Sequence, residues 1–210
     1  MKNAKKEHEI VQACVMSVNL DPARLEDFRC AYRQQLMPAL IVEPGFSGGV
    51  VLSDAVTNKG FVVTLWSSNA AARRAETHCR NAMACALLPG LAQHPLLELH
   101  EVLVQAGQRA GSHFARVITL PVPAERIDSA LSVYENEYLP LLKTQAGFCG
   151  VMWLANRTLG SGWGLSFWTA RKQMVAADQE GEFFPTVLAR LAAYFSQQPK
   201  KGYYTVDMLA

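Results

Sequence analysis

Charged residues are scarce in this chain of 210 residues: Lys and Arg number 20, Asp and Glu number 18, and the formal net charge is +2. A surface that binds nucleic acid is strongly basic, and here the basic residues do not run together beyond Lys200 and Lys201. No apolar run approaches the roughly 20 residues that a membrane-spanning helix needs. We therefore expect neither a nucleic acid nor a membrane as a partner.

The chain also lacks the marks of secretion and of a disulfide framework. Residues 1–9 are charged and no apolar stretch follows them, so no signal peptide is predicted. The cysteines form an odd, scattered set without a CxxC pair, and the spacing of Cys79 and Cys85 matches no usual metal or redox motif. We expect reduced core thiols and a cytoplasmic protein. The five cysteines are Cys14, Cys30, Cys79, Cys85 and Cys149.

Several catalytic motifs are missing. The sequence has no P-loop, no dinucleotide-binding fingerprint and no GxSxG elbow. The glycine-rich residues 45–49 turn into a strand and do not open a helix, so they form a poor phosphate cradle. The five histidines are spread along the chain without the spacing of metal ligands. We therefore predict no metal and no bound cofactor.

A repeat is the strongest positive signal. The motif Gly-Phe-x-Gly at residues 45–48 leads through two strand-like segments to Trp66, and the same motif at 147–150 leads to Trp168. Each copy follows its counterpart by 102 residues (147 − 45 and 168 − 66). Such self-similarity indicates a duplicated domain. The same offset also aligns Arg24/Arg126, Tyr32/Tyr134, Pro38/Pro140, Leu40/Leu142, Leu52/Leu154, Gly60/Gly162 and Val104/Val206.

The repeat predicts a first domain at residues 13–105, a linker at 106–114 and a second domain at 115–209. Each domain reads as strand, helix, strand, strand, helix, strand. The second helix of the second domain, from residue 171 to about 197, is expected to be interrupted near Gly181 and Pro185. An Ala-rich helix is predicted at 69–87. The predicted strands are residues 13–20, 47–56, 60–67, 96–105, 115–121, 148–157, 161–169 and 201–209.

This order defines a fold class. A four-stranded antiparallel sheet with two helices on one face is the ferredoxin-like arrangement. Its other face is apolar and needs a cover, and two such units can cover each other by closing their sheets into one barrel. The prediction is an α+β protein with tandem ferredoxin-like βαββαβ repeats that form a pseudo-dimeric α/β barrel. The sequence leaves open whether the barrel closes within one chain or by swapping, and a homodimer is compatible with it.

Strand alternation indicates a ligand site. Trp66 shares a strand face with Thr64, and Trp168 shares one with Ser166, so small side chains beside a large indole can leave a cavity between sheet and helices. In each domain a tyrosine on the first helix, Tyr32 or Tyr134, could add a phenolic hydroxyl to this cavity. Such walls suit a small, flat aromatic molecule. The alternative is that these Trp and Tyr side chains are core aromatics that mark the fold.

His78 is the candidate acid–base group. Its helical spacing from Ala71, Ala75 and Ala82 would point it toward the sheet, where a His of near-neutral pKa could take a phenolic proton. Its repeat counterpart is Glu180, which is also ionisable. The alternative is that His78 lies on the solvated flank of its helix.

Both halves resemble the antibiotic biosynthesis monooxygenase superfamily of dimeric α/β-barrel proteins. The resemblance rests on the Gly-Phe-x-Gly motif, the hairpin after it and the strand that ends in Trp66 or Trp168. One branch of that superfamily oxidises anthrones or hydroquinones with O2 and no cofactor. The resemblance thus implies a cofactor-independent monooxygenase acting on a small phenolic, anthrone or quinone-like compound. Trp66 and Trp168 match the pocket Trp of that branch. Together with the residues taken from the strand and helix patterns, the predicted site has Trp66, Trp168 and His78 as catalytic residues, and Tyr32, Tyr134, Thr64 and Ser166 as substrate-binding residues.

Two other functions stay open for the same cavity. One is a non-catalytic binding or stress-response protein for an aromatic metabolite. The other is haem binding or degradation, for which the resemblance implies a His on the second helix and an Asn in the first strand. The chain has Cys85 and Val187 near that helix position, and Asn19 at the strand's end aligns with Pro121. These departures disfavour haem degradation.

Overall fold

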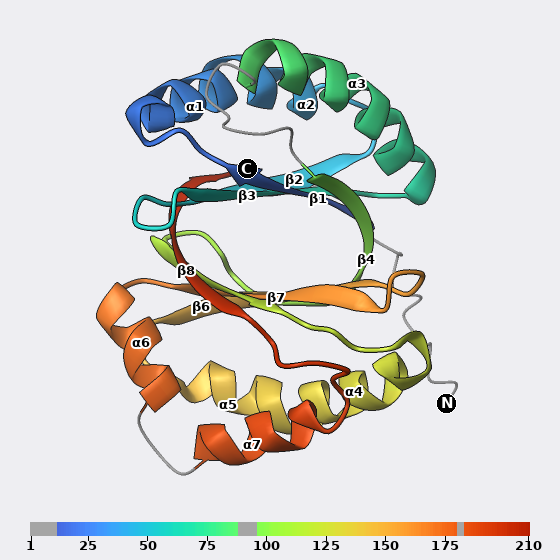
Figure 1. Ribbon diagram of the computed structural model, residues 1–210, viewed down its shortest axis with the longest axis vertical. Helices are drawn as coiled ribbons and strands as arrows, with labels where there is room; N and C mark the ends of the chain where they lie inside the picture. The colour runs from blue at the N-terminus through green and yellow to red at the C-terminus, as the bar shows by residue number, and fades with distance from the viewer. Residues whose placement is uncertain (1–11, 88–95, 180–182) are drawn as a thin grey trace, which may run out of the picture.

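The computed structural model describes residues 12–87, 96–179 and 183–210 (Figure 1). The order strand, helix, strand, strand, helix, strand occurs twice along them. The strands are β1 (Gln12–Asn19), β2 (Phe46–Asp54), β3 (Lys59–Trp66), β4 (Leu96–Gly107), β5 (Phe114–Thr119), β6 (Phe148–Asn156), β7 (Ser161–Trp168) and β8 (Lys201–Leu209). The helices are α1 (Leu25–Ala31), α2 (Met37–Ile41), α3 (Asn69–Leu87), α4 (Ile127–Val133), α5 (Leu139–Thr144), α6 (Arg171–Gln179) and α7 (Phe183–Ala192).

The eight strands form one closed barrel in the order β1-β3-β2-β8-β5-β7-β6-β4. The strands of the first half follow the order β4-β1-β3-β2, those of the second half β8-β5-β7-β6, and all pairings are antiparallel. Two pairings, β2 with β8 and β4 with β6, join the halves. In Figure 1, β4 and β8 cross from one sheet to the other on opposite sides of the barrel. The predicted fold class is confirmed, and the barrel closes within one chain.

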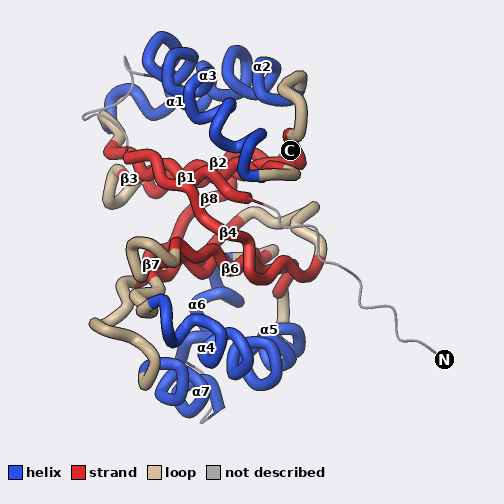
Figure 2. Tube along the Cα trace, turned by 90° about the vertical axis from the view of Figure 1, so that its right-hand side faces the viewer, coloured by secondary structure: helices blue, strands red, loops and turns tan. Residues whose placement is uncertain are grey.

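The elements stack in four layers, helices on sheet on sheet on helices (Figure 2). Alternation along each strand sends side chains in two directions. On β3, for example, Phe61, Val63 and Leu65 join the core inside the barrel. Val62 and Trp66 belong instead to the core under α1, α2 and α3. A third apolar core lies under the helices of the second half. Both faces of each sheet are therefore buried.

The first helix of each half contains a wide turn before a proline. Residues Tyr32–Leu36 and Tyr134–Tyr138 are π-helical, and Pro38 and Pro140 follow at the start of α2 and α5. A proline inside a helix lacks the N–H that its turn needs, and its ring clashes with the carbonyl of residue i−4. A π-helical turn is one way to relieve that clash. The repeated proline thus explains the repeated wide turn.

The glycines of the repeated motif make a corner that only glycine adopts easily. Gly45 and Gly147 have φ angles of 91° and 76°, in the left-handed region that a Cβ disfavours. Their carbonyls accept hydrogen bonds from Ser67 N at 2.8 Å and from Thr169 N at 2.9 Å. The corner therefore ties the start of one hairpin strand to the residue after the tryptophan that ends the other.

The phenylalanines of the motif pack on the tryptophans. The rings of Phe46 and Trp66 lie 5.4 Å apart at 74°, and those of Phe148 and Trp168 lie 5.7 Å apart at 79°. Edge-to-face pairs of this kind stabilise beyond the area that they bury. The sequence repeat is thus a repeated packing unit, which favours the interpretation of both tryptophans as core aromatics.

Most predicted elements are close to the observed ones. The strand predicted at 201–209 is β8, and the helix predicted at 69–87 is α3. Pro185 lies in the first turn of α7, where a missing N–H costs little, while Gly181 lies outside the described residues. β4 runs to Gly107, two residues into the predicted linker. The division into domains at 13–105 and 115–209 stays a prediction.

Three cysteines are described as free thiols. Cys14 is buried and Cys149 is half-buried, but Cys30 is exposed on α1, so the expectation of core thiols is wrong for Cys30. The side chains of Cys79 and Cys85 lie outside the described part of the chain. No helix within the described residues is both long and apolar enough to cross a membrane.

We expect Gly107→Ala to destabilise the protein more than Gly111→Ala. Both glycines have φ of 80°, but a Cβ at Gly107 would lie 2.3 Å from the Cys149 carbonyl oxygen, whereas nothing lies within 4 Å at Gly111. The shared backbone strain costs about 1–2 kcal/mol, and the steric clash adds about 1–3 kcal/mol at Gly107 alone. Denaturant unfolding of both variants measures this difference. Equal losses would show that no close approach constrains β4 at its end.

His100 predicts a pH dependence of stability. Its ring faces the barrel interior, its Nε2 lies 3.5 Å from Glu98 Oε2, and burial lowers its pKa to about 4 although a hydrogen bond involving Glu98 opposes this. The unfolded chain, with an ordinary pKa of 6.5, then binds a proton that the folded chain does not. Stability is full above pH 6.5 and falls by about 3 kcal/mol as the pH drops to about 4.

The neutral variant His100→Gln isolates this contribution. We expect its unfolding free energy to fall less steeply than that of the parent between pH 6.5 and pH 4, because the carboxylates titrate equally in both proteins. Urea unfolding at four or five pH values gives both curves. Parallel curves would mean that folding does not lower the pKa of His100.

Candidate functional site

The two halves share a fold but differ in polarity under their helices. The second half carries a cluster of polar side chains that reach the space between sheet and helices, and the first half has mostly apolar residues at the corresponding positions. The pairs, first half before second, are Cys14/Arg116, Leu36/Tyr138, Glu76/Asp178 and Leu99/Lys201. At these four pairs of positions, the buried polar groups are therefore concentrated under the helices of the second half.

Arg116 is the centre of this cluster. It lies in the middle of β5, points toward the helices and is only 1% exposed. Its Nη1 donates to Asp178 on α6, and its Nη2 donates to the Tyr138 hydroxyl at 3.3 Å. The guanidinium carbon lies 5.6 Å from the centre of the Trp168 ring, within the range of a cation–π interaction. A fixed cation thus lies beneath the helices.

Asp178 holds this cation in place. Its carboxylate also accepts hydrogen bonds from Lys201 Nζ at 2.8 Å and from the Tyr203 hydroxyl at 2.5 Å, both on β8. Burial alone would raise the pKa of Asp178, but the charge of Arg116 and the two hydrogen bonds from β8 lower it overall. The carboxylate is therefore ionised at neutral pH. Burial alone would lower the pKa of Arg116, but its interactions with Tyr138, Asp178 and Tyr134 raise it overall.

Two tyrosines complete the polar side of the site. The rings of Tyr134 and Tyr138 lie 5.0 Å apart, and Tyr134 lies 4.8 Å from the ring of Trp153. Burial raises the pKa of Tyr134 well above its ordinary value and also raises that of Tyr138. Both hydroxyls therefore stay protonated and can donate hydrogen bonds at neutral pH.

A cavity of about 50 Å³ lies among these groups. It is lined by Arg116, both tyrosines and Ser166, and otherwise by apolar side chains, which include Trp153 on β6 and Leu191 on α7. Gly164 also lines it, at the position where the first half has the buried Val62. The space exists partly because β7 has no side chain at that position. We call this space the β7 cavity.

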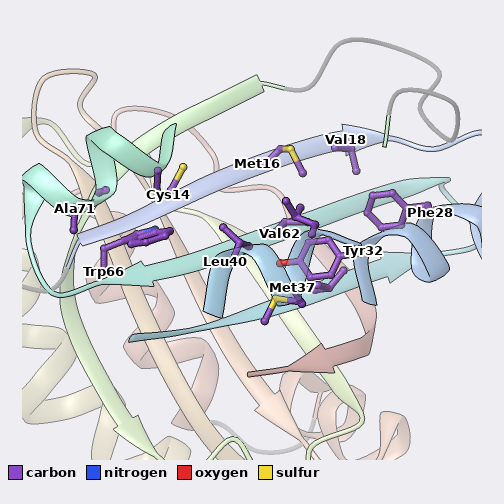
Figure 3. Packing of buried hydrophobic residues seen from close by; sticks show 14 of the residues in the cluster. Cys14, Met16, Val18, Phe28, Tyr32, Met37, Leu40, Val62, Trp66 and Ala71 are labelled. Carbon is purple, nitrogen blue, oxygen red and sulfur yellow. The ribbon is translucent and has the colours of Figure 1, made fainter. Parts of the chain in front are cut away.

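The first half is filled at the corresponding place. Figure 3 shows Tyr32, Met37, Leu40 and Val62 packed together between the sheet and the helices. The space left beside Tyr32 is about 10 Å³. A half-buried ion pair forms one wall of it, in which Arg29 Nε lies 2.9 Å from Asp207 Oδ1. That volume holds one water molecule at most.

The predicted site residues divide between these places. Tyr134 and Ser166 line the β7 cavity, whereas Tyr32 lines only the small space of the first half. Trp168 lies beside the cavity without lining it and contacts Arg116 from the sheet side. The structure thus brings together two of the predicted substrate-binding residues with one predicted catalytic residue beside them.

Both tryptophans are fully buried and hydrogen-bonded to the small residue on the same strand face. Trp66 Nε1 donates to Thr64 Oγ1 at 2.9 Å, and Trp168 Nε1 donates to Ser166 Oγ at 3.0 Å. Neither Trp66 nor Thr64 lines a described cavity. These small residues satisfy the indole N–H, a role that the sequence interpretation did not consider.

His78 lies elsewhere, and the expectation that it points toward the sheet is wrong. Its side chain is 66% exposed on α3, and its Nδ1 lies 3.1 Å from Glu43 Oε1 in the first half. The alternative interpretation, a solvated helix flank, describes its position. Its counterpart Glu180 lies outside the described residues.

The sequence interpretation missed Arg116, Tyr138 and Asp178 as site residues. A signal for Arg116 was present, since it interrupts an apolar strand on the face that carries Ile118. Nothing in the sequence paired it with Asp178, because that contact spans 62 residues between a strand and a helix. Among the described residues, no three His, Cys, Asp or Glu side chains gather as they would to hold a metal ion.

Comparison with known proteins gives a fold. No family model matches the sequence. No curated protein matches it either. A candidate monooxygenase from Fusobacterium nucleatum has a similar structure, with a TM-score of 0.77 and 10% identity over 96% of this chain and 94% of that one. An anthrone oxidase-like protein gives a TM-score of 0.71 and 14% identity over 97% and 94%.

A haem-degrading enzyme from Listeria monocytogenes gives a TM-score of 0.55 and 10% identity over 92% of this chain and 98% of that one. All these identities are low, so the likeness concerns the fold. The chain has the fold of antibiotic biosynthesis monooxygenases, with two ferredoxin-like domains in one barrel.

We expect Asp178→Asn to destabilise the protein by about 3 kcal/mol, since it leaves the buried Arg116 without its anionic partner. The control is Asp128→Asn, whose carboxylate is 80% exposed and pairs with Arg157 at the surface. That change should cost about 0.5 kcal/mol or less. Denaturant unfolding at neutral pH measures both. Similar small losses in the two variants would show that Arg116 does not depend on Asp178.

Proposed function

We propose that this protein is a cofactor-independent monooxygenase that oxidises a small aromatic phenol, anthrone or quinone-like compound with O2, and that the β7 cavity is its site. One observation carries the proposal. Arg116, a buried cation fixed by Asp178, lies with two protonated tyrosines beside a cavity whose other walls are apolar or aromatic. Such a site suits a flat ring that bears an ionisable hydroxyl or carbonyl oxygen. The fold is compatible with this activity but does not specify it.

The chemistry depends on forming an anion of the substrate. The methylene group of an anthrone is conjugated through the aromatic rings with the carbonyl across the central ring. It loses a proton to give an enolate, and the enolate reduces O2 and forms a C–O bond to it. Breaking the O–O bond with loss of water leaves a new carbonyl, so that one methylene group and one molecule of O2 give one carbonyl group and one molecule of water. The step that the protein can assist is formation of the anion.

Arg116 and the tyrosines suit that step. A fixed cation and two hydroxyl donors in a water-poor cavity stabilise negative charge on the substrate oxygen far more than water-exposed groups do. Tyr134 and Tyr138 supply the hydrogen bonds because burial keeps them protonated. Lowering the pKa of the bound substrate in this way raises the fraction that is present as enolate.

Asp178 is a poor base for the same step. Its pKa is lowered and its oxygens already accept from Arg116, Lys201 and Tyr203. Taking a proton would break this network. We infer that Asp178 positions Arg116, and that the substrate proton leaves to water once the anion is stabilised.

Ligand entry requires the cavity to widen. Its volume is about 50 Å³, whereas an engineered protein cavity that binds benzene measures about 150 Å³. The outer wall consists of Leu191 on α7 together with Phe195 and Pro199 after it. The other walls belong to the barrel and to the helix of the tyrosines. Outward movement of α7 is therefore the least disruptive route to a bound ring.

The test is O2 uptake by the chelator-treated protein with a panel of anthrones and hydroquinones, measured against the rate without protein. Uptake above that rate supports the proposal. Quenching of Trp fluorescence by the same compounds without uptake would favour the binding-protein function instead. A Soret band on titration with hemin would favour haem binding, which the likeness to the Listeria enzyme's fold makes worth testing.

We expect Gly164→Val to reduce O2 uptake at least about tenfold, because it places in the β7 cavity the side chain that fills the first half. The nearest atom to an added Cβ is Leu120 Cδ1 at 3.3 Å, which a flexible side chain can accommodate, so the melting temperature should change little. The matched control, Val62→Ile at the corresponding position of the first half, should leave uptake unchanged. Full activity in Gly164→Val, or equal losses in both variants, would place the site elsewhere.

A further inference from the structure

A second cavity, larger than the β7 cavity, lies at one end of the barrel. It measures about 360 Å³, within the range of small-molecule sites, and opens where β1, β2 and β5 end and where β3, β7 and β8 begin. Its lining includes side chains that face the barrel interior, so it lies on the opposite face of the sheet from the β7 cavity. We call it the mouth pocket.

The inner end of the mouth pocket is aromatic. Phe61 is buried and Trp163 is half-buried, and their rings lie 4.7 Å apart at 65°. The two residues occupy corresponding positions in the two halves, and their rings meet edge-on inside the barrel. Tyr204 adds a third ring from β8. An aromatic ligand can stack or pack edge-on against such a surface.

Gly202 lets the third ring lie close to the strand. A Cβ at Gly202 would lie 2.8 Å from Tyr204 Cε2, so any other residue would push the tyrosine away. Burial and the nearby Asp54 raise the pKa of Tyr204, which keeps its hydroxyl protonated. The first-half residue that corresponds to Gly202 is His100, whose ring is buried. The pocket is therefore lined unequally by the two halves.

The charges at the rim favour an anion. Lys59 and Lys200 line the pocket with exposed ammonium groups, and among the described residues no carboxylate pairs with either of them. Lys59 lies two residues before Phe61 and on the same strand face, so its stem leads from the rings toward the opening. Lys201 does not add to this rim charge, because its Nζ forms an ion pair with Asp178, at 2.8 Å, on the helix side of the sheet.

The carboxylate of Asp54, at the rim, already accepts hydrogen bonds within the protein. Asp54 Oδ1 accepts from Val56 N at 3.0 Å, and Oδ2 accepts from the Thr57 hydroxyl at 2.5 Å. These bonds hold Asp54 in the turn between β2 and β3. The rim therefore carries the positive charges of Lys59 and Lys200 against the negative charge of Asp54, whose oxygens already accept hydrogen bonds.

We propose that the mouth pocket is a second ligand site, separate from the proposed monooxygenase cavity, that binds a small planar aromatic carboxylate. The ring packs against Phe61, Trp163 and Tyr204, and the carboxylate faces Lys59 and Lys200. A neutral ring lacks the second interaction, and an aliphatic acid lacks the first. The combination selects the chemical class.

The experiment is calorimetric titration with 2-naphthoate and with the uncharged 2-naphthamide, which has the same rings. Changing both lysines, Lys59→Gln with Lys200→Gln, should weaken 2-naphthoate binding about tenfold and leave 2-naphthamide binding unchanged. The control Lys143→Gln removes an exposed lysine of α5, far along the chain from the pocket, and should change neither. All three positions are exposed, so the variants should fold.

Two further variants locate the ligand. Trp163→Leu should weaken binding of both compounds about tenfold, because it removes the larger stacking ring. Gly164→Val, which fills the β7 cavity on the other face of β7, should leave 2-naphthoate binding intact. The proposal is overturned if 2-naphthoate does not bind, if the lysine pair has no effect, or if Gly164→Val abolishes binding.

Discussion

The structure depends on one constraint: each four-stranded sheet is apolar on both faces, while its two helices can cover only one. The apolar side chains of β3 need a cover on both faces. Phe61, Val63 and Leu65 face the barrel interior, and Val62 and Trp66 face the helices. The second sheet provides that cover, and the pairings of β2 with β8 and of β4 with β6 leave no open edge among the described strands. Because closure satisfies both the apolar faces and the strand edges, all further variation must occur in the spaces that closure leaves.

Against this apolar background, the burial of Arg116 requires an explanation. A buried ion pair is weak evidence for stability, since an apolar pair of similar volume is often as stable or more so. At the positions of Arg116 and Tyr138, the first half has Cys14 and Leu36 in a well-filled core. The shared fold therefore does not require a cation at this position. Its retention beside a cavity, with an ionised partner to fix its direction, is typical of a site that binds or stabilises negative charge.

The sequence predicted what is repeated and local. The Gly-Phe-x-Gly motif, the strand order and the position of α3 all follow from glycine, proline and periodicity, and each recurs in the other half. The interpretation of Trp66 and Trp168 as ligand walls stays a prediction: neither lines the β7 cavity, and each donates its indole N–H to a neighbouring hydroxyl, a contact that the sequence could not show. The expectation for His78 is wrong for another reason: it lies on an exposed face of its helix, where its Nδ1 lies 3.1 Å from Glu43 Oε1, 35 residues away along the chain. The pairing of Arg116 with its carboxylate is equally non-local.

Two copies of one fold in one chain permit this division of roles. The barrel needs each half to supply apolar faces and pairing edges, but it does not need either half to keep a cavity. The first half can therefore fill its space with Val62 and Tyr32 while the second half keeps Gly164 and the polar cluster. A dimer of identical domains cannot separate the two roles, because every substitution that fills one cavity fills both. Covalent linkage removes that coupling, and the unequal lining of the mouth pocket follows from the same freedom.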